Sequence, residues 1–338
     1  MSMFQIQGGF AGLAASTRVR LARNIKGYPY RGLNADQYQQ IANKVWDALQ
    51  TAPAIASAFT MRQVHPNSSD GAALVEQHLI SPALAQSGGW LIASKNGGVA
   101  IMIGEEDHIR LQVIGSGLCP KECLTEAKRL AALIESQVPM DFDETLGYLT
   151  ACPSNLGTGL RASIMLHLPV LGKAGRIQDV ISAAGRQGFT VRGAYGEGSQ
   201  AVGGFYQLSN QVTLGISEDA IIEKLVSLAT NVIENEKRLR EQLRSQDENA
   251  LADQICRAAG TLQTARLMDT SEAINCLSHV LVGLSMGYLQ GVSPEEVCAM
   301  EQRIHPALLG GAPAARDKKR AELLRNMAKN LIISETSL

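Results

Sequence analysis

The 338-residue chain has few aromatic residues and almost no net charge. Phe, Trp and Tyr together make up 4% of it, which leaves little material for stacking the bases of a nucleic acid. Lys and Arg number 31 against 32 Asp and Glu, so no excess of charge favours binding to DNA, RNA or an anionic membrane. We therefore expect neither nucleic acid nor membrane among the partners.

The sequence also lacks segments that would direct it out of the cytoplasm. No apolar run approaches the roughly 20 residues of a membrane-spanning helix, and the apolar residues 1–15 have no basic region before them. The six cysteines form no repeated CxxC pair, so a zinc site or a disulfide framework is poorly supported, even though Cys119 and Cys123 have helical spacing. We predict a soluble cytoplasmic protein with reduced thiols and no metal site of its own.

Common nucleotide-binding and hydrolase motifs are missing as well. The chain has no GxxxxGK[ST] loop, no GxGxxG after a strand, no HExxH and no GxSxG. A nucleoside triphosphate would therefore have to be held by arginine side chains and loop backbone. Each candidate alone is more typical of a surface arginine, but their Gly-rich or strand-end contexts together favour a polyphosphate clamp. The candidates are Arg18, Arg20, Arg110, Arg161 and Arg192, with His78 as a weaker one.

Hydrophobic residues make up 45% of the chain, which is enough for a full core. Their pattern along the sequence predicts an α+β fold. Two β-rich runs around Asn96-Gly97 predict a hairpin, and residues 122–137 have the spacing of an amphipathic helix. A short buried strand over 148–152, a strand over 162–168 and a hairpin over 205–214 complete a mostly antiparallel sheet flanked by helices.

The pattern changes after residue 217. Ser217 precedes a long helical pattern over 220–243, and four or five more helical segments follow, one of them capped by Ser293-Pro294. No strand is expected past Gly215. We predict a catalytic domain over 1–240 and an all-helical domain over 241–338.

Acidic residues follow the second strand of the first hairpin. A run such as Glu105-Glu106-Asp107 is usually a solvated loop, but this one directly follows an apolar strand. Glu197 lies in a Gly-Glu-Gly turn, where a ligand can approach the backbone closely. Two carboxylates facing one cleft suit a guanidinium group, whose forked N–H donors match carboxylate oxygens.

Four segments resemble, in order, the motifs of the phosphagen kinases, which are ATP:guanidino phosphotransferases. They read STRVRLAR, EEDHIR, GYLTACPSNLGTGLRAS and RGAYGEGSQAVGGFYQLSNQVTLG, and the resemblance covers roughly residues 13–235. Animal members carry an N-terminal helical domain, which this chain is expected to lack because it begins almost at the first motif. Its C-terminal helical extension instead resembles that of the bacterial protein arginine kinases, and residues 316–321, RDKKRA, fit their RDxxRA motif.

The resemblance implies a role for particular residues. Glu106 corresponds to the catalytic base, Glu197 to the second carboxylate that holds the guanidinium, and Cys152 to the reactive cysteine. Phosphoarginine as an allosteric ligand would bind Arg316, Asp317, Arg320 and Ala321. ATP, accompanied by Mg²⁺, would be bound by Ser16, Thr17, Arg18, Val19, Arg20, His78, Arg110, Arg161, Ala162, Ser163, Ile164, Met165, Arg192, Gly193, Ala194, Tyr195, Gly196 and Glu197.

Two departures from the family pattern stand out, and neither removes a charged group of the site. Gly104 replaces the usual Asn before the acidic pair, and Ser154 replaces a common Thr but keeps the hydroxyl.

The implied activity is transfer of the ATP γ-phosphoryl group to arginine side chains of proteins, which marks them for degradation or alters stress regulators. Partners implied in the same way are protein substrates with exposed arginines, an activator protein, Clp-type protease machinery and further copies of the chain in a dimer or larger oligomer. Two alternatives stay open: a kinase of free arginine or another small guanidino compound, and an adaptor with a decayed kinase site.

Overall fold

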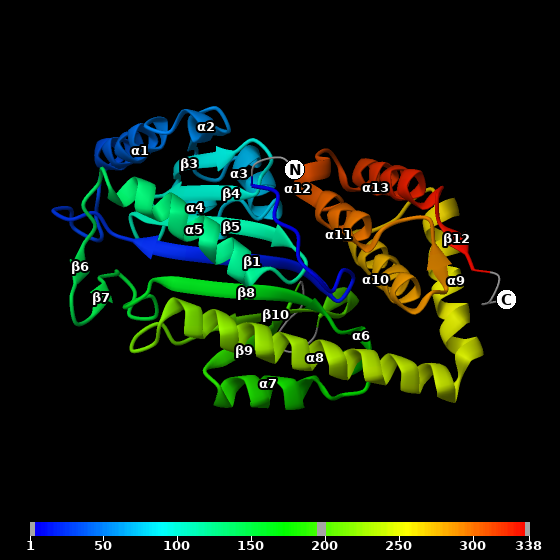
Figure 1. Ribbon diagram of the computed structural model, residues 1–338. Helices are drawn as coiled ribbons and strands as arrows, with labels where there is room; N and C mark the ends of the chain where they lie inside the picture. The colour runs from blue at the N-terminus through cyan, green and yellow to red at the C-terminus, as the bar shows by residue number, and fades with distance from the viewer. Residues whose placement is uncertain (1–3, 195–200, 335–338) are drawn as a thin grey trace. The chain divides into compact units, whose positions relative to one another are not determined.

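A computed structural model describes residues 4–194 and 201–334 of the chain (Figure 1). The chain forms two compact units. Unit 1 comprises Met1–Gly8, Ser16–Ile164 and Ser209–Val226, and unit 2 comprises Gly9–Ala15, Met165–Leu208 and Ser227–Leu338. The boundary expected near residue 240 falls inside a helix that continues to Gln246, and that division of the chain stays a prediction.

The main sheet has eight strands in the order β2-β3-β4-β5-β1-β8-β10-β9. Strands β2, β3, β4, β5 and β1 pair antiparallel throughout. The eight strands are β1 (Ala14–Arg23), β2 (Phe59–Val64), β3 (Gly89–Ser94), β4 (Val99–Ile103), β5 (Ile109–Ser116), β8 (Leu160–His167), β9 (Phe189–Gly193) and β10 (Phe205–Asn210). The hairpin predicted at Asn96-Gly97 is confirmed as β3–β4, and so is the strand predicted over 162–168.

Two strand predictions are wrong in extent. Residues 205–214 do not form a hairpin: β10 ends at Asn210, whose side-chain amide accepts from Ala162 N at 2.8 Å and donates to Leu160 O at 3.0 Å. Residues 148–152 contribute only β7 (Gly147–Tyr148), which pairs with β6 (Phe142–Asp143). The next residues leave the strand because other partners take their backbone N–H groups; that of Ala151, for example, donates to a carboxylate.

Two long helices cover one face of the sheet in unit 1, and two short helices pack on part of the other face. Helix α5 (Pro120–Glu135), which confirms the helix predicted over 122–137, packs on β5, and α1 (Ala35–Gln50) packs on β3 and β4. Leu21 and Val19 of β1 stand opposite Leu111 and Val113 of β5, so one apolar face lies under α5. The shorter helices of unit 1 are α2 (Pro53–Ala56), α3 (Ser69–Glu76) and α4 (Pro82–Ser87).

Helix α8 (Glu218–Gln246) begins where the sequence predicts. Ser217 Oγ accepts a hydrogen bond from Ala220 N at 3.2 Å, which satisfies one of the free N–H groups of the first turn. Among the described residues, no helix combines the length and the apolar character that crossing a membrane requires.

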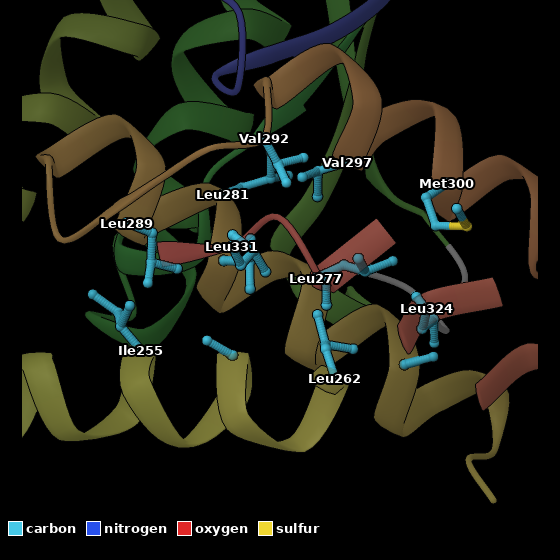
Figure 2. Close-up of a cluster of buried hydrophobic side chains, with 14 of the residues drawn as sticks. Ile255, Leu262, Leu277, Leu281, Leu289, Val292, Val297, Met300, Leu324 and Leu331 are labelled. Atoms are coloured by element: carbon cyan, nitrogen blue, oxygen red, sulfur yellow. The ribbon is translucent and has the colours of Figure 1, made fainter. Parts of the chain in front are cut away.

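Unit 2 is mainly helical, and its core lies among its C-terminal helices. Figure 2 shows Ile255, Leu262, Leu277, Leu281 and Leu324 packed together, all of them buried. Ser293 caps α11 as expected, by a reciprocal pair of hydrogen bonds with Glu296. The helices of this unit outside α8 are α6 (Pro169–Lys173), α7 (Ile177–Arg186), α9 (Glu248–Thr264), α10 (Thr270–Met286), α11 (Pro294–Arg303), α12 (Pro306–Leu309) and α13 (Pro313–Ala328).

The prediction that no strand follows Gly215 is wrong for one short pair of strands. Leu289–Gln290 and Ile332–Ile333 form a small antiparallel pair, β11 and β12. The pair follows from burial, because Leu289 is one of the core side chains and Gly291 lets the chain turn immediately after it with a φ of +92°.

A buried ion pair links α8 to α6 within unit 2. Glu236 and Arg240 are 0% and 3% exposed, and Arg240 Nε donates to Glu236 Oε1 at 2.8 Å. The same carboxylate accepts from the backbone N–H groups of Val170 and Leu171 at the start of α6. Removing one member of such a pair leaves the other charge buried without compensation, which costs far more than a surface pair contributes.

We predict that Glu236→Gln lowers the free energy of unfolding by about 3–5 kcal/mol, because Arg240 loses its counter-charge in a buried site. Glu234→Gln, on the same helix, is the matched control; Glu234 forms an exposed pair with Lys237, and the expected change is about 0.5 kcal/mol or less. Urea unfolding followed by circular dichroism measures both variants. Equal midpoints for the two would contradict the importance given to the buried pair.

Candidate active site

The strand pairing gathers arginine side chains on the sheet face opposite α5. Alternation along β1 places Arg18 and Arg20 on the face that does not carry Val19 and Leu21. Arg110 of β5 stands opposite Ala22 and shares this face. We call Arg18, Arg20, Arg110 and Arg161, which comes from the start of β8, the arginine cluster.

The electrostatics of the cluster call for an anion. Desolvation, followed by the positive charges of Arg18, Arg110 and Arg161, lowers the pKa of Arg20 well below its ordinary value. The Nε atom of Arg20 is buried and has no hydrogen-bond partner among the residues that the structure describes. A buried donor without an acceptor costs about 1–3 kcal/mol, and more when the group is charged. An oxygen-rich polyanion such as a triphosphate would satisfy both requirements.

Glu105 and Glu106 occupy different surroundings although they are adjacent in sequence. The carboxylate of Glu105 is 6% exposed and bonds to Arg110 and to the backbone N–H of Glu106. Burial alone would raise the pKa of Glu105, but the Arg110 charge and the backbone hydrogen bond hold it below its usual value. Glu106 is exposed in the loop between β4 and β5, so its carboxylate is the one accessible to a substrate.

The glycine before this pair is explained by backbone geometry. Gly104 has a φ of +89°, a left-handed conformation that Gly and Asn adopt most easily. A Cβ atom added there would lie 3.2 Å from the Tyr38 ring. The Gly that replaces the family's usual Asn therefore keeps the turn and lets Tyr38 pack against it.

His78 is brought to the arginine face by its backbone. It follows α3 with a φ of +60°, and its carbonyl oxygen accepts from Gln112 Nε2. Gln112 stands opposite Arg20 in the β1–β5 register and so shares its face. The histidine predicted as an ATP-binding residue is thus near the arginine cluster.

Some of the predicted ATP-binding residues point elsewhere. Thr17 and Val19 are fully buried, on the side of the sheet that α5 covers. Thr17 Oγ1 donates to Gly117 O at 2.6 Å and accepts from Cys119 N at 3.1 Å, at the start of α5. On β8, Arg161 and Ser163 share one face, whereas Ala162 and Ile164 take the other. From these ranges the side chains on the arginine face are those of Ser16, Arg18, Arg20, Arg161 and Ser163, and Ser163 is buried there with its hydroxyl on Arg18 O.

Residues 149–159, which we call the Cys152 loop, connect β7 to β8. Cys152 is half-buried, and its sulfur lies 3.0 Å from Ser154 Oγ. Thr213 Oγ1 donates to the carbonyl groups of Ser154 and Leu156, which anchors the far side of the loop. The hydroxyl kept at Ser154 is therefore a direct neighbour of the reactive thiol predicted from the sequence.

Several predicted residues cannot be placed beside these groups. Four of them belong to unit 2: Met165, Arg192, Gly193 and Ala194. Arg192 is exposed, Gly193 ends β9 and Ala194 follows it. Tyr195, Gly196 and Glu197 lie outside the described residues, so the second guanidinium-holding carboxylate stays a prediction.

The predicted phosphoarginine site lies on α13 in unit 2. Arg320 is 1% exposed and donates to Ile304 O, Met268 O and Asp317 Oδ1, all at 2.7–2.8 Å. The charge of Arg320 is thus met by Asp317 within the motif, whereas Arg316 is half-exposed and Ala321 is buried. Arg320 fixes α13 to two neighbouring loops, a structural role that the sequence did not indicate.

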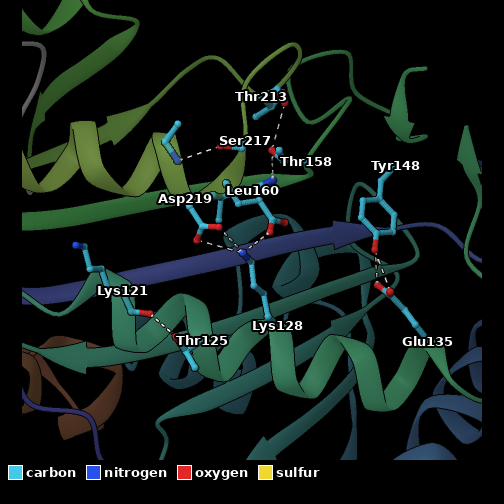
Figure 3. A network of polar contacts seen from close by, with 12 residues as sticks. Lys121, Thr125, Lys128, Glu135, Tyr148, Thr158, Leu160, Thr213, Ser217 and Asp219 are labelled. Atoms are coloured by element: carbon cyan, nitrogen blue, oxygen red, sulfur yellow. Dashed lines mark hydrogen bonds and ion pairs between the residues drawn. The ribbon is translucent and has the colours of Figure 1, made fainter. Parts of the chain in front are cut away.

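A cavity of about 490 Å³ lies on the other face of the sheet, beside α5. Its lining includes Arg23, Glu135 and Tyr148. By the alternation along β1, Arg23 lies on the same face of the sheet as Leu21 and not on the face of Arg20. Figure 3 shows the polar contacts here, in which Lys128 of α5 pairs with Asp219 and with Glu218, at 3.3 and 3.0 Å. The cavity is therefore separate from the arginine cluster, and its polar groups are largely paired with one another.

Two buried polar residues beside the site were not predicted from the sequence. Asn24 and Asp107 are 0% and 3% exposed, and their side chains bond to each other. The signal available in the sequence was an Asp that directly follows the two glutamates, and an Asn at the end of the arginine-bearing strand. Within the described part of the chain, no cluster of His, Cys, Asp and Glu has the arrangement of a metal site.

Comparison with known proteins agrees with this geometry. The ATP:guanido phosphotransferase C-terminal catalytic domain matches residues 38–239, and the protein-arginine kinase McsB C-terminal domain matches residues 248–336. The protein-arginine kinases of Bacillus cereus (strain AH187) and Bacillus mycoides (strain KBAB4) are both 40% identical to the chain. In each case the match covers 93% of this chain and 91% of the relative.

Solved structures give the same result for the fold. The crystal structure of a lombricine kinase superposes with a TM-score of 0.59 at 25% identity, over 70% of each chain. A duplicated taurocyamine kinase from Schistosoma mansoni with bound transition-state analogue components gives a TM-score of 0.56 at 26% identity, over 75% of this chain and 39% of that one. By its catalytic domain, its C-terminal domain and its fold, the chain belongs to the ATP:guanido phosphotransferase family and, within it, to the protein-arginine kinases.

Proposed function

We propose that the protein transfers the γ-phosphoryl group of ATP to the guanidinium groups of arginine side chains in other proteins. The observation that carries the ATP part of the proposal is the buried, unpartnered Nε of Arg20 among three further arginines. The protein-substrate part is supported by the curated relatives, which are protein-arginine kinases over nearly the whole chain length.

The arginine cluster acts on the triphosphate. Planar guanidinium groups grip phosphate oxygens bidentately and stabilise the negative charge that spreads over the transferring phosphoryl group. Mg²⁺ bound with the nucleotide would supply further neutralisation of this charge. Glu105 holds Arg110 by its carboxylate, which orients that arginine before any nucleotide arrives.

Glu106 acts on the substrate guanidinium. A guanidinium must lose a proton before a nitrogen lone pair can attack phosphorus, and an adjacent carboxylate can accept that proton. Glu106 is exposed, and the neighbouring Glu105 is engaged by Arg110, so the two acids divide the work. Glu197 would hold the other side of the guanidinium, and the Cys152 thiol would lie close to the reacting nitrogen.

The further assignments rest on the family. We include in the proposal a cytoplasmic location, protein substrates with exposed arginines, an activator protein, assembly of several copies, and delivery of modified proteins to Clp-type protease machinery or control of stress regulators. Phosphoarginine would act as an allosteric ligand at Arg316, Asp317, Arg320 and Ala321. The match of the C-terminal domain over residues 248–336 supports this part.

The direct test is incubation with Mg-ATP and an unfolded test protein, followed by mass spectrometry without acid, because P–N bonds hydrolyse in acid. We expect phosphoarginine on the protein, and we expect millimolar free arginine to compete poorly. Efficient phosphorylation of free arginine in the same mixture would favour the small-molecule alternative. If neither ATP nor arginine is consumed, the result would favour the alternative of an adaptor with a decayed kinase site.

We predict that Glu106→Gln lowers kcat for protein phosphorylation by about 10²–10⁴-fold, because the amide cannot accept the guanidinium proton. The affinity of the variant for ATP should stay within about two-fold of the original value. Loss of one hydrogen bond to a charged group would change the affinity far more. Glu144→Gln, an exposed acid on the β6–β7 hairpin, is the control and should leave kcat unchanged. Near-normal turnover by the Glu106 variant would remove this residue from the role of base.

We predict opposite effects of Arg20→Met on the free and the nucleotide-bound protein. Removing one of four neighbouring positive charges should raise the melting temperature of the free protein, since mutual repulsion falls. The same change should weaken ATP binding roughly 10–150-fold, the equivalent of about 1.5–3 kcal/mol for hydrogen bonds to a charged group. Arg62→Met, an exposed arginine paired with Asp70, is the control for both measurements. Calorimetry that finds unchanged ATP affinity would contradict the clamp.

A further inference from the structure

A buried hydrogen-bond network joins three segments of unit 1 around the Asp107 carboxylate. Asp107 Oδ1 accepts from Asn24 Nδ2 at 2.9 Å and from the backbone N–H of Ala151 at 2.7 Å. Asp107 Oδ2 accepts from Asn155 Nδ2 at 3.1 Å. The donors come from the end of β1 and from two positions in the Cys152 loop, whereas the carboxylate directly follows Glu106.

Asn24 completes the connection from its other atoms. Its Oδ1 accepts from His108 N at 2.9 Å, and its Nδ2 also donates to Leu149 O at 3.1 Å. The Asn24 side chain thus bonds both to the acidic loop and to the start of the Cys152 loop. Asn24 is 0% exposed, so water does not compete for these bonds.

His108 fixes the acidic loop from a third side. Its Nδ1 accepts from Ile25 N at 3.0 Å, and its Nε2 lies 2.9 Å from Pro29 O, so Nε2 carries the proton and the ring is neutral. Burial lowers the pKa of His108, which agrees with the neutral form. The residue after Asp107 is therefore bonded to the segment that continues from β1.

We propose that Asp107 is a positioning residue, which holds the loop that carries Glu106 and the loop that carries Cys152 in a fixed relation to the arginine-bearing strand β1. Asp107 itself is buried and does not touch substrate; it acts through its neighbours. This proposal rests on the proposed function for its effect on turnover, but its effect on the Cys152 loop does not depend on that function.

The acceptor capacity of a carboxylate explains why this residue is acidic. Three N–H donors converge on two oxygens, and a carboxylate offers about four lone-pair sites with no donor of its own. A side chain without acceptors would leave the Ala151 N–H and one of the two N–H groups of the Asn24 amide without an acceptor, at a cost of about 1–3 kcal/mol for a buried donor. An Asn in place of Asp107 would keep the acceptor at Oδ1, and Asn155 could turn its amide to present oxygen to the new NH₂ group.

The consequence for catalysis follows from distance. Glu106 is covalently adjacent to Asp107, and Cys152 is adjacent to Ala151, which is bonded to Asp107 at 2.7 Å. Loss of the network lets both loops move relative to β1. A displacement of about 1 Å at reacting groups costs roughly 10²-fold in rate.

The test compares Asp107→Ala with Asp107→Asn in the full-length protein. We expect Asp107→Ala to lower kcat for protein phosphorylation about 10²-fold, with the KM for ATP changed less than about three-fold, because the arginine cluster stays on its strands. In the same variant, alkylation of Cys152 by iodoacetamide, followed by peptide mass spectrometry, should become several-fold faster. Asp107→Asn should restore most of both properties, because it keeps the acceptor while removing the charge.

Internal and matched controls separate this role from general destabilisation. Cys256, half-buried on α9 of unit 2, should alkylate at an unchanged rate in every variant. Asp143→Ala removes another carboxylate that accepts two backbone N–H bonds, from Thr145 and Leu146, but in the β6–β7 hairpin. It should leave both kcat and the Cys152 rate unchanged.

Two results would overturn the proposal. If Asp107→Asn is as slow as Asp107→Ala, the negative charge and not the set of acceptors is what matters. If Cys152 alkylates at the original rate in Asp107→Ala, the carboxylate does not hold that loop. Should Asp107→Ala fail to fold, Asn155→Ala removes only the outermost bond; faster Cys152 alkylation with an unchanged circular dichroism spectrum supports the proposal, and an unchanged rate contradicts it.

Discussion

The repulsion among four arginines on one sheet face is the constraint on which the site depends. Strand β1 carries apolar residues toward α5 and arginines toward the opposite face, and strand β5 repeats the pattern in register. The apolar face of these strands lies on the side of the sheet on which α5 packs. That packing holds like charges near one another, and burial together with these charges lowers the pKa of Arg20. In the proposed function, a triphosphate that binds these arginines would relieve this unfavourable electrostatic energy.

The carboxylates around the cluster have separate tasks, set by burial. The side chain of Glu105 is buried and pairs with Arg110, Glu106 is exposed to solvent, and Asp107 is buried in a network of N–H donors. Three consecutive acids thus have three different surroundings because the loop turns each in a different direction. The left-handed conformation at Gly104 begins this turn. Local backbone geometry, more than residue type, decides which acid can act as a base.

Much of the fold could be predicted from the sequence because local signals were strong, whereas the roles of the site residues stay predictions. The Asn96-Gly97 hairpin and helix α5 depend on turn chemistry and on apolar periodicity, both of which are local. The hairpin expected over 205–214 failed because Asn210 bonds to the distant strand β8, which no local pattern reveals. The resemblance assigned Arg320 to a phosphoarginine site, and no local pattern indicated that its side chain donates to backbone carbonyls 16 and 52 residues away. Asp107 escaped notice for the same reason, since its donors come from segments 44 to 83 residues distant.

The central claim is that the arginine cluster is a triphosphate site in which Arg20 Nε–H lacks an acceptor until nucleotide binds. Nitrogen-15 NMR of the arginine Nε–H signals during titration with Mg-ATP tests this directly, with Arg20 assigned from the spectrum of Arg20→Lys. The account predicts that the Arg20 signal moves downfield and exchanges more slowly with water as ATP saturates the protein, whereas that of Arg62 does not change. An Arg20 signal that stays in place at saturation would contradict the account.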